Sequence, residues 1–547
     1  MPSLNLDVIV FGVYLVVVAL VGLLASRREK ESDDYFLAGR NLTWWIIGGS
    51  LIAANISTHH FVGMGGQGFS KGLAIASYEW VAAIALILYG KFFLPYYLKS
   101  RITTMPEFLQ TRFDERVRLT FAIMSLVGYI FIELAVVLYT GSMAIETIFG
   151  LPLTWGLAIL CVVGGGYAIY GGFKSVAYTD IIQVTVLILG GLTVTLLGLH
   201  KVGVLMPGYS GTVWGGFQAV LDGAPEKFHM VMPWDDPELS WVGVFFGGMW
   251  LANIFYWGCN QFITQRTLAA RNIWHGQMGV IFAGFLKLLV PFLVVLPGII
   301  AFKLFNAETG LLKAQCILKS TEADRAFPTL VKQLLPTGCT GLVLAGLMGC
   351  VMSHIASMLN ASSSILTFDI YKHFMKKAAT NAELIRFGRW ASFTVLVAAT
   401  CIGFFLRDLK AIFTYIQSGW SFAYPAICAV FLAGFFYKRA NAKGCLYALF
   451  AGPIWATIFT LAEHFHWVPW AKPISFLFRA GLDFVVCCVV IFALRTRGSV
   501  IPAQAIVDRS FPPEVVAYMK TIPWWRSFPF WATVLAICVV ALYVRFF

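Results

Sequence analysis

Charged residues are scarce in this chain, and that scarcity excludes a soluble protein of the same length. Asp, Glu, Lys and Arg make up 12% of the 547 residues, whereas 59% are hydrophobic and the mean hydropathy is +0.77. A soluble domain carries roughly 25% charged residues, which cover its surface. The apolar residues form blocks of about 20 residues, the length of helix that crosses a bilayer core of about 30 Å. The composition therefore predicts an all-α integral membrane protein in a lipid bilayer.

Other absences narrow the class further. The apolar blocks do not alternate with polar residues as the strands of a transmembrane barrel do. The 11 cysteines contain no Cys-x-x-Cys motif, so we expect no structural zinc site. Only Cys316 and Cys339 flank one polar loop, and whether they form a disulfide stays open. The net charge of +13 does not indicate nucleic-acid binding, because Lys and Arg lie mostly between the apolar blocks.

About 14 segments are long enough to span a bilayer. Their approximate limits are 6–26, 44–66, 73–97, 118–148, 152–170, 177–200, 241–263, 276–304, 340–371, 384–406, 409–436, 441–463, 471–494 and 526–546. The connections that hold most of the basic residues alternate with the others, which places them in the cytoplasm and both termini outside. The sequence thus predicts a multi-pass protein of the plasma membrane, or of the inner membrane in a Gram-negative bacterium.

Two of these segments contain polar interruptions. Asn55-Ile56-Ser57 lies inside the second segment, and the run Asn253 to Gln261 lies inside the seventh. Such breaks are tolerated where the freed backbone faces protein or a water-filled cavity. They stand five segments apart, as in a transporter built from inverted repeats with a midplane substrate site. The alternative is two ordinary helices with tightly packed polar residues.

This spacing suggests a division of the chain into five parts. They are an extra N-terminal helix and cytoplasmic loop (1–43), a first repeat (44–201), an extracellular loop (202–240), a second repeat (241–436) and extra C-terminal helices (437–547).

Ionisable residues at membrane depth are costly and mark candidate functional positions. Glu79 and Lys287 lie inside apolar segments, Asp180 begins the sixth segment, and His354 lies within the ninth. Glu79 and Lys287 could form a buried ion pair that only joins two helices. A cavity lined by both, with aromatic rings nearby, would bind a polyhydroxylated substrate, because these groups accept from and donate to several hydroxyls.

A set of motifs in order along nearly the whole chain resembles the sodium/solute symporter family. The motifs are Tyr35-Phe36-Leu37-Ala38-Gly39, Ser50 to Ser57, Gly171 to Asp180, Gln265 to Ala270 and Phe368-Asp369-Ile370-Tyr371. Within the family the chain resembles above all the bacterial sodium/galactose symporter and the animal sodium/glucose cotransporters. The resemblance implies a LeuT-type five-plus-five inverted repeat, with one extra helix before the core and three after it.

The resemblance also implies positions for a sugar site. Its sugar ligands correspond to Asn55, His60, Glu79, Asn253, Lys287 and Gln417. Tyr256 stands where the family's inner aromatic gate covers the sugar, with Trp257 beside it.

The family's sodium site corresponds to carbonyls of Ala53, Ile56 and Cys350 and to two adjacent serine hydroxyls, with Asp180 on the exit path. Here the serine positions hold Ser353 and His354, and an imidazole is a poor ligand for a hard cation. Three alternatives stay open. His354 turns away and sodium still binds; a protonated His354 replaces the ion and couples transport to H⁺; or coupling is lost, which leaves a facilitator or sensor.

The resulting hypothesis is a sodium-coupled symporter of a glucose- or galactose-type monosaccharide that works by alternating access, as a monomer. A membrane enzyme is disfavoured, because the only tempting pair, His59 and His60, consists of neighbours that point about 100° apart on a helix. A receptor is disfavoured because no effector domain follows the last segment.

Overall fold

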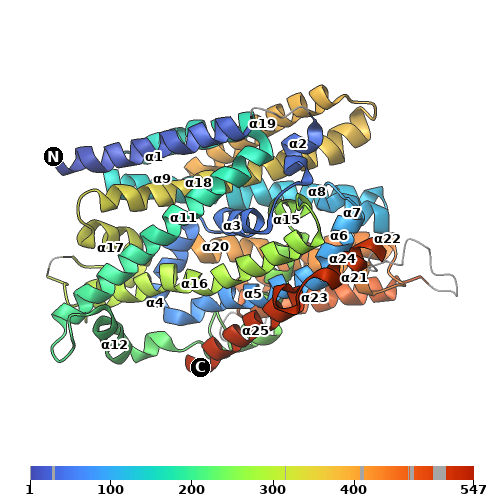
Figure 1. Ribbon diagram of the computed structural model, residues 1–547. Helices are drawn as coiled ribbons and strands as arrows, with labels where there is room; N and C mark the ends of the chain where they lie inside the picture. Colours follow the sequence, from blue (N-terminus) through green and yellow to red (C-terminus); the bar gives the residue numbers. More distant parts are fainter. Residues whose placement is uncertain are drawn as a thin grey trace.

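The computed structural model is a bundle of long and interrupted helices. It describes residues 2–26, 31–314, 316–406, 412–465, 467, 474–496 and 513–547, and within these ranges it contains isolated β-bridges but no β-strand. Most helices run side by side along one axis, with the N-terminus and the C-terminus near the same end of the bundle (Figure 1). The expectation of an all-α protein is confirmed.

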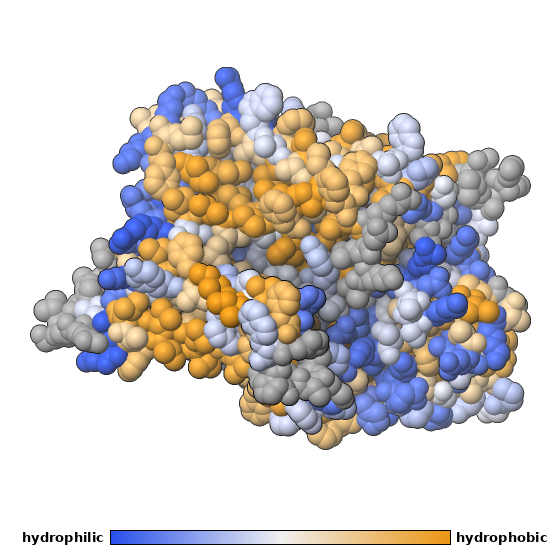
Figure 2. Space-filling model, turned by 180° about the vertical axis from the view of Figure 1, so that it is seen from behind, coloured by the Kyte–Doolittle hydropathy of each residue, from blue (hydrophilic) through white to orange (hydrophobic). Residues whose placement is uncertain are grey.

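Long helices make up most of the bundle. They are α1 (Pro2–Ser26), α8 (Glu115–Val127) continuing into α9 (Ala135–Phe149), α10 (Leu153–Ile159) leading into α11 (Gly165–Leu205), α16 (Ile273–Phe305), α18 (Cys339–Ser364), α19 (Asn381–Phe405), α22 (Ala442–His464), α23 (Phe476–Ala493) and α25 (Phe528–Arg545). Large apolar side chains such as Val162, Phe246 and Phe405 point outward from the protein. Hydrophobic residues cover much of the rear face, with hydrophilic ones gathered mainly toward its left and right edges (Figure 2). This pattern suits a molecule surrounded by lipid over its middle.

Shorter helices complete the chain. They are α2 (Ser32–Leu37), α3 (Trp44–Asn55), α4 (Gly65–Ser70), α5 (Ser77–Leu88), α6 (Leu94–Lys99), α7 (Met105–Arg112), α12 (Val213–Gly223), α13 (Trp241–Phe246), α14 (Gly248–Ile254), α15 (Gln261–Leu268), α17 (Ala326–Leu334), α20 (Ile412–Trp420), α21 (Tyr424–Phe436) and α24 (Pro513–Thr521). Among them α3, α15 and α20 lie in the middle of the bundle (Figure 1), and α3 packs against α11, α15, α16 and α18.

Both predicted interruptions are present. α3 ends at Asn55, Ile56 is extended, and the chain resumes as a π-helical turn over His59–Met64. In the seventh segment α14 passes into a π-helical turn over Phe255–Cys259, and Asn260 is extended before α15 begins. Gly172 has φ +57°, a conformation that favours glycine, and it marks a kink inside α11.

The predicted number of 14 spans is not confirmed, because several spans are not single helices. Within the described residues ten helices are long and apolar enough to cross a membrane, and α20 with α21 makes an eleventh span bent by 46°. Segments 44–66 and 241–263 fall short because they are broken, and α1 offers a shorter apolar stretch, Leu6–Gly22. The bend between α20 and α21 was not predicted.

Candidate functional site

One cavity in the middle of the bundle collects the predicted sugar-site residues. Its walls include all six predicted ligands, Asn55, His60, Glu79, Asn253, Lys287 and Gln417, together with Tyr256 and Trp257. They come from α3 and the turn after it, α5, α14 and its turn, α16 and α20. The broken ends of the second and seventh segments therefore meet at the same place, although their roles in binding remain predictions.

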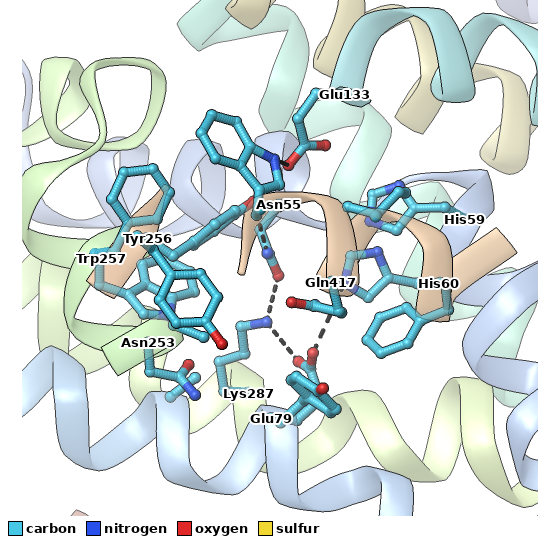
Figure 3. A pocket seen from close by; sticks show the side chains of 18 residues that line it. Asn55, His59, His60, Glu79, Glu133, Asn253, Tyr256, Trp257, Lys287 and Gln417 are labelled. Atoms are coloured by element: carbon cyan, nitrogen blue, oxygen red, sulfur yellow. Dashed lines mark hydrogen bonds and ion pairs between the residues drawn. The ribbon is translucent and has the colours of Figure 1, made fainter. Parts of the chain in front are cut away.

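An ion pair lies at the floor of this cavity. Lys287 Nζ is 2.5 Å from Glu79 Oε2 and also donates to the Asn55 side-chain oxygen. The Lys287 and Glu79 side chains are 1% and 3% exposed, so each charge depends on the other for stabilisation. Figure 3 shows Lys287 between Asn55 and Glu79, with Gln417 and His60 beside them. The pair joins two helices and lines a cavity, so the two interpretations given by the sequence are compatible.

Hydrogen bonds orient the neighbours of this pair. The Ser57 amide donates to His60 Nδ1, so the other ring nitrogen of His60 carries the proton and faces Glu79 Oε1 at 3.7 Å. The Asn55 side-chain amide donates to the Tyr256 hydroxyl at 2.9 Å. Hydroxyl, amide, carboxylate and ammonium groups thus point into one small volume under aromatic rings. This chemistry suits a ligand with several hydroxyls and an apolar ring face.

Two of the predicted sodium ligands, Ala53 and Ile56, lie at the end of α3, and the other two, Cys350 and Ser353, lie on α18, which packs against α3. The Ser57 amide donates to His60 Nδ1 rather than to the Ala53 carbonyl, which frees that carbonyl from the helix. The Ser353 hydroxyl is buried and donates to Asp180 Oδ1 at 2.5 Å, so its lone pairs can accept a cation. Carbonyl and hydroxyl oxygens like those of Ala53, Ile56, Cys350 and Ser353 are the kind of ligand that Na⁺ prefers, and their role as its ligands stays a prediction.

His354 is turned toward a carbonyl other than those of Ala53 and Ile56. Its Nδ1 lies 2.8 Å from the Ala54 carbonyl oxygen, and its Nε2 lies 3.6 Å from Glu133 Oε2. One ring nitrogen of His354 therefore bonds the Ala54 carbonyl, and the other faces the Glu133 carboxylate. This geometry is compatible with a His354 side chain that leaves the predicted ligands free and with a protonated His354 that faces Glu133, so the alternatives given by the sequence stay open.

Asp180 is the centre of a second buried network. Its carboxylate accepts from Ser50 and Ser353 and pairs with Arg266 Nη2 at 3.3 Å, and Asp180 and Arg266 are both 0% exposed. Arg266 also donates to the Ser50 carbonyl and to the Ser357 hydroxyl. The network ties α3, α11, α15 and α18 together next to the helix break.

The sequence analysis did not assign several residues of the cavity wall to the site, among them three that carry polar side-chain groups. Glu133, His59 and Trp420 line the cavity, and Glu133 Oε1 accepts from Trp420 Nε1 at 2.9 Å. Glu133 lies in the apolar segment 118–148, so the rule that selected Glu79 would also have found it. Cys316 and Cys339, whose pairing was left open, are free thiols.

Comparisons with known proteins agree with this architecture. The model of the sodium:solute symporter family matches residues 35–452. The sodium/glucose cotransporter of Vibrio parahaemolyticus is 39% identical over 533 residues, which cover 94% of this chain and 96% of that protein. Sodium/glucose cotransporter 1 of Ovis aries is 35% identical over 471 residues, covering 82% and 70%.

Among solved structures, a Na⁺-coupled sialic acid symporter in a substrate-bound, outward-open state has a TM-score of 0.76. It is 21% identical and the match covers 89% of this chain and 97% of that one. At this identity the likeness establishes a shared fold alone.

Proposed function

The chain belongs to the sodium:solute symporter family, and from this premise we propose that it is a sodium-coupled symporter of a glucose- or galactose-type monosaccharide. The observation that carries the proposal is the cavity itself, where Asn55, Glu79 and Lys287 meet under aromatic rings at a helix break. The relatives named as sodium/glucose cotransporters support both the ion and the substrate class.

The cavity residues would exchange hydrogen bonds with one another for hydrogen bonds with the sugar. Glu79 and Lys287 satisfy each other in the empty cavity, and sugar hydroxyls would share them, the carboxylate accepting and the ammonium donating. The Tyr256 and Trp257 rings would cover the apolar face of the sugar from the side of α14. Because these groups come from both broken segments, binding would draw the two repeats together, as alternating access requires.

Sodium would be held by oxygens of Ala53, Ile56, Cys350 and Ser353, and its charge would favour one arrangement of the helices around the break. Asp180, which bonds Ser353, stands next to this set on the expected exit path. We place the protein in the plasma membrane, acting as a monomer, with residues 44–201 and 241–436 as its inverted repeats.

Uptake into proteoliposomes tests the proposal. Labelled glucose and galactose are supplied under an inward sodium gradient, with an equal potassium gradient or proton gradient in parallel arms. We expect accumulation above the outside concentration only with sodium. If sugar equilibrates without accumulating in every arm, the protein is a facilitator and the symporter proposal is wrong. If only the proton gradient drives accumulation, the coupling ion is H⁺ and not Na⁺.

A variant with a matched control tests whether sugar uptake depends on the cavity. Glu79→Gln keeps the shape of the side chain but removes its charge, so sugar uptake should fall strongly. Glu383→Gln provides the control, because Glu383 pairs with Lys376 in an exposed position away from the cavity.

A further inference from the structure

Two buried polar atoms face each other between the sugar cavity and the break after α3. Glu133 Oε2 and His354 Nε2 are 3.6 Å apart, and neither has a hydrogen-bond partner among the described residues. The side chains of His354 and Glu133 are 0% and 4% exposed. Buried polar groups are nearly always hydrogen-bonded, so this juxtaposition needs a reason.

Each residue is anchored on its other side. The Ala54 carbonyl can only accept, so the bond of 2.8 Å from His354 requires the proton to be on Nδ1. Glu133 uses its other oxygen to accept from the Trp420 indole at 2.9 Å. A chain of polar contacts thus runs from the Ala54 carbonyl to Trp420, with a hydrogen bond at each end and, in its middle, a 3.6 Å contact between His354 and Glu133 that is not a hydrogen bond.

The two ends of this chain lie in the two regions that a symporter must connect. Ala54 is next to Ala53, one of the carbonyls proposed for sodium. Trp420 is the last residue of α20, where the eleventh span bends by 46°, and it lines the sugar cavity. Figure 3 shows Glu133 on the opposite side of Asn55 from Glu79.

The middle of the chain lies in an irregular part of a helix. Glu133 belongs to a π-helical turn, Gly128–Leu134, between α8 and α9. Turns of this kind are frequently found at functional sites.

We infer that His354, Glu133 and Trp420 form a positioning chain that couples cation binding at the helix break to closure of the sugar cavity. The inference rests on the proposed function. His354 fixes the direction of the Ala54 carbonyl and with it the adjacent carbonyls, while Glu133 fixes the indole that a bound sugar would contact. A change at either end therefore shifts the equilibrium at the other, and by linkage the effect is reciprocal.

The readout is the ratio of the sugar dissociation constants measured without and with saturating sodium, at equal ionic strength, on purified protein in nanodiscs. Ratios of roughly 5 to 150 are typical of such coupling. Trp420→Phe keeps the aromatic ring but removes the N–H group, and Glu133→Leu removes both contacts of the carboxylate. In both variants we expect the ratio to fall at least about fivefold, toward one.

Glu133→Gln is the rescuing variant. Its amide oxygen can still accept from Trp420, and its amide N–H can donate to His354 Nε2, so the chain stays connected and the ratio stays near that of the wild type. Trp80→Phe and Asp483→Asn are controls, because Trp80 and Asp483 also bury an unpartnered polar atom but do not line the cavity. A purely structural role would lower the melting temperature and leave the ratio unchanged.

The outcomes separate the two claims. A wild-type ratio of one contradicts the proposed function and the chain together. A wild-type ratio above five that persists in Trp420→Phe and Glu133→Leu overturns the chain alone. If Glu133→Leu does not fold, Trp420→Phe decides, since it removes a single N–H group.

Discussion

Two buried ion pairs in this protein differ in what surrounds them. Asp180 and Arg266 form what we call the sealed pair: both side chains are fully buried. Serine hydroxyls and backbone carbonyls form their other hydrogen bonds. Glu79 and Lys287 are nearly as buried but line a cavity, where a ligand can still reach them. Burial alone therefore does not show which ion pair a ligand can reach. The two pairs differ in access, because the Glu79 and Lys287 side chains line the described cavity and those of Asp180 and Arg266 do not.

Breaking the sealed pair should have the largest effect. Arg266→Leu leaves the Asp180 carboxylate buried without its counter-charge, which typically costs about 3–5 kcal/mol of stability. We expect a strong drop in the thermal unfolding temperature of the detergent-purified protein. The double variant Asp180→Asn with Arg266→Leu should recover part of the loss, and an unchanged unfolding temperature in the single variant would contradict the sealed network.

Breaking the cavity pair should affect transport more than stability. Lys287→Met removes charge-assisted hydrogen bonds worth about 1.5–3 kcal/mol, which corresponds to an increase of roughly 10- to 100-fold in the KM for sugar. Water in the cavity can solvate Glu79, so the unfolding temperature should fall less than in Arg266→Leu. Initial uptake rates over a range of sugar concentrations give the KM. An equal fall of the unfolding temperature in Lys287→Met and Arg266→Leu would contradict the proposed difference between the two ion pairs.

A smaller change tests the hydrogen bonds around the cavity pair. Tyr256→Phe keeps the ring and removes the hydroxyl that accepts from Asn55. A neutral hydrogen bond contributes about 0.5–1.5 kcal/mol, so the KM should rise roughly 2- to 10-fold. Tyr447→Phe, on an exposed tyrosine, is the control. A KM identical to that of the wild type would show that the Tyr256 hydroxyl does not contribute to sugar binding.

The ion pair between Lys71 and Asp236, outside the membrane, should have the smallest effect. Partial burial raises the pKa of the Asp236 carboxyl, but hydrogen bonds from Lys71 and from two backbone amides outweigh it, so this pKa lies below its usual range. The resulting stability is complete above the ordinary carboxyl pKa of about 4 and is lost as the pH falls through the lower folded-state value.

Asp236→Asn should therefore cost at most about 1 kcal/mol near pH 7, as is usual for pairs in contact with water. The difference from the wild type should shrink as the pH falls below about 4. Unfolding temperatures measured across this range check the expectation, and a difference that grows on acidification would show that the pair does not have this role.

Much of the architecture could be predicted because hydropathy acts locally. The apolar blocks predicted most spans, and the interruptions at Asn55 and Asn260 are breaks in the structure. The break at Trp420 to Tyr424 was not predicted, since that stretch is aromatic and carries no run of polar side chains. The exact number of spans is not confirmed, because a broken helix and a continuous one can have the same hydropathy.

The sequence by itself determined the membrane class and the family, and it named candidate intramembrane residues such as Glu79 and Lys287. Each follows from composition, order and spacing along the chain, since the cost of a charge in lipid depends on its own position. Only the tertiary structure decided the partners: Lys287 with Glu79, Arg266 with Asp180, and His354 with Glu133. These contacts join residues distant in sequence, and hydrogen bonding depends on atoms within about 3 Å in space, which no local pattern specifies.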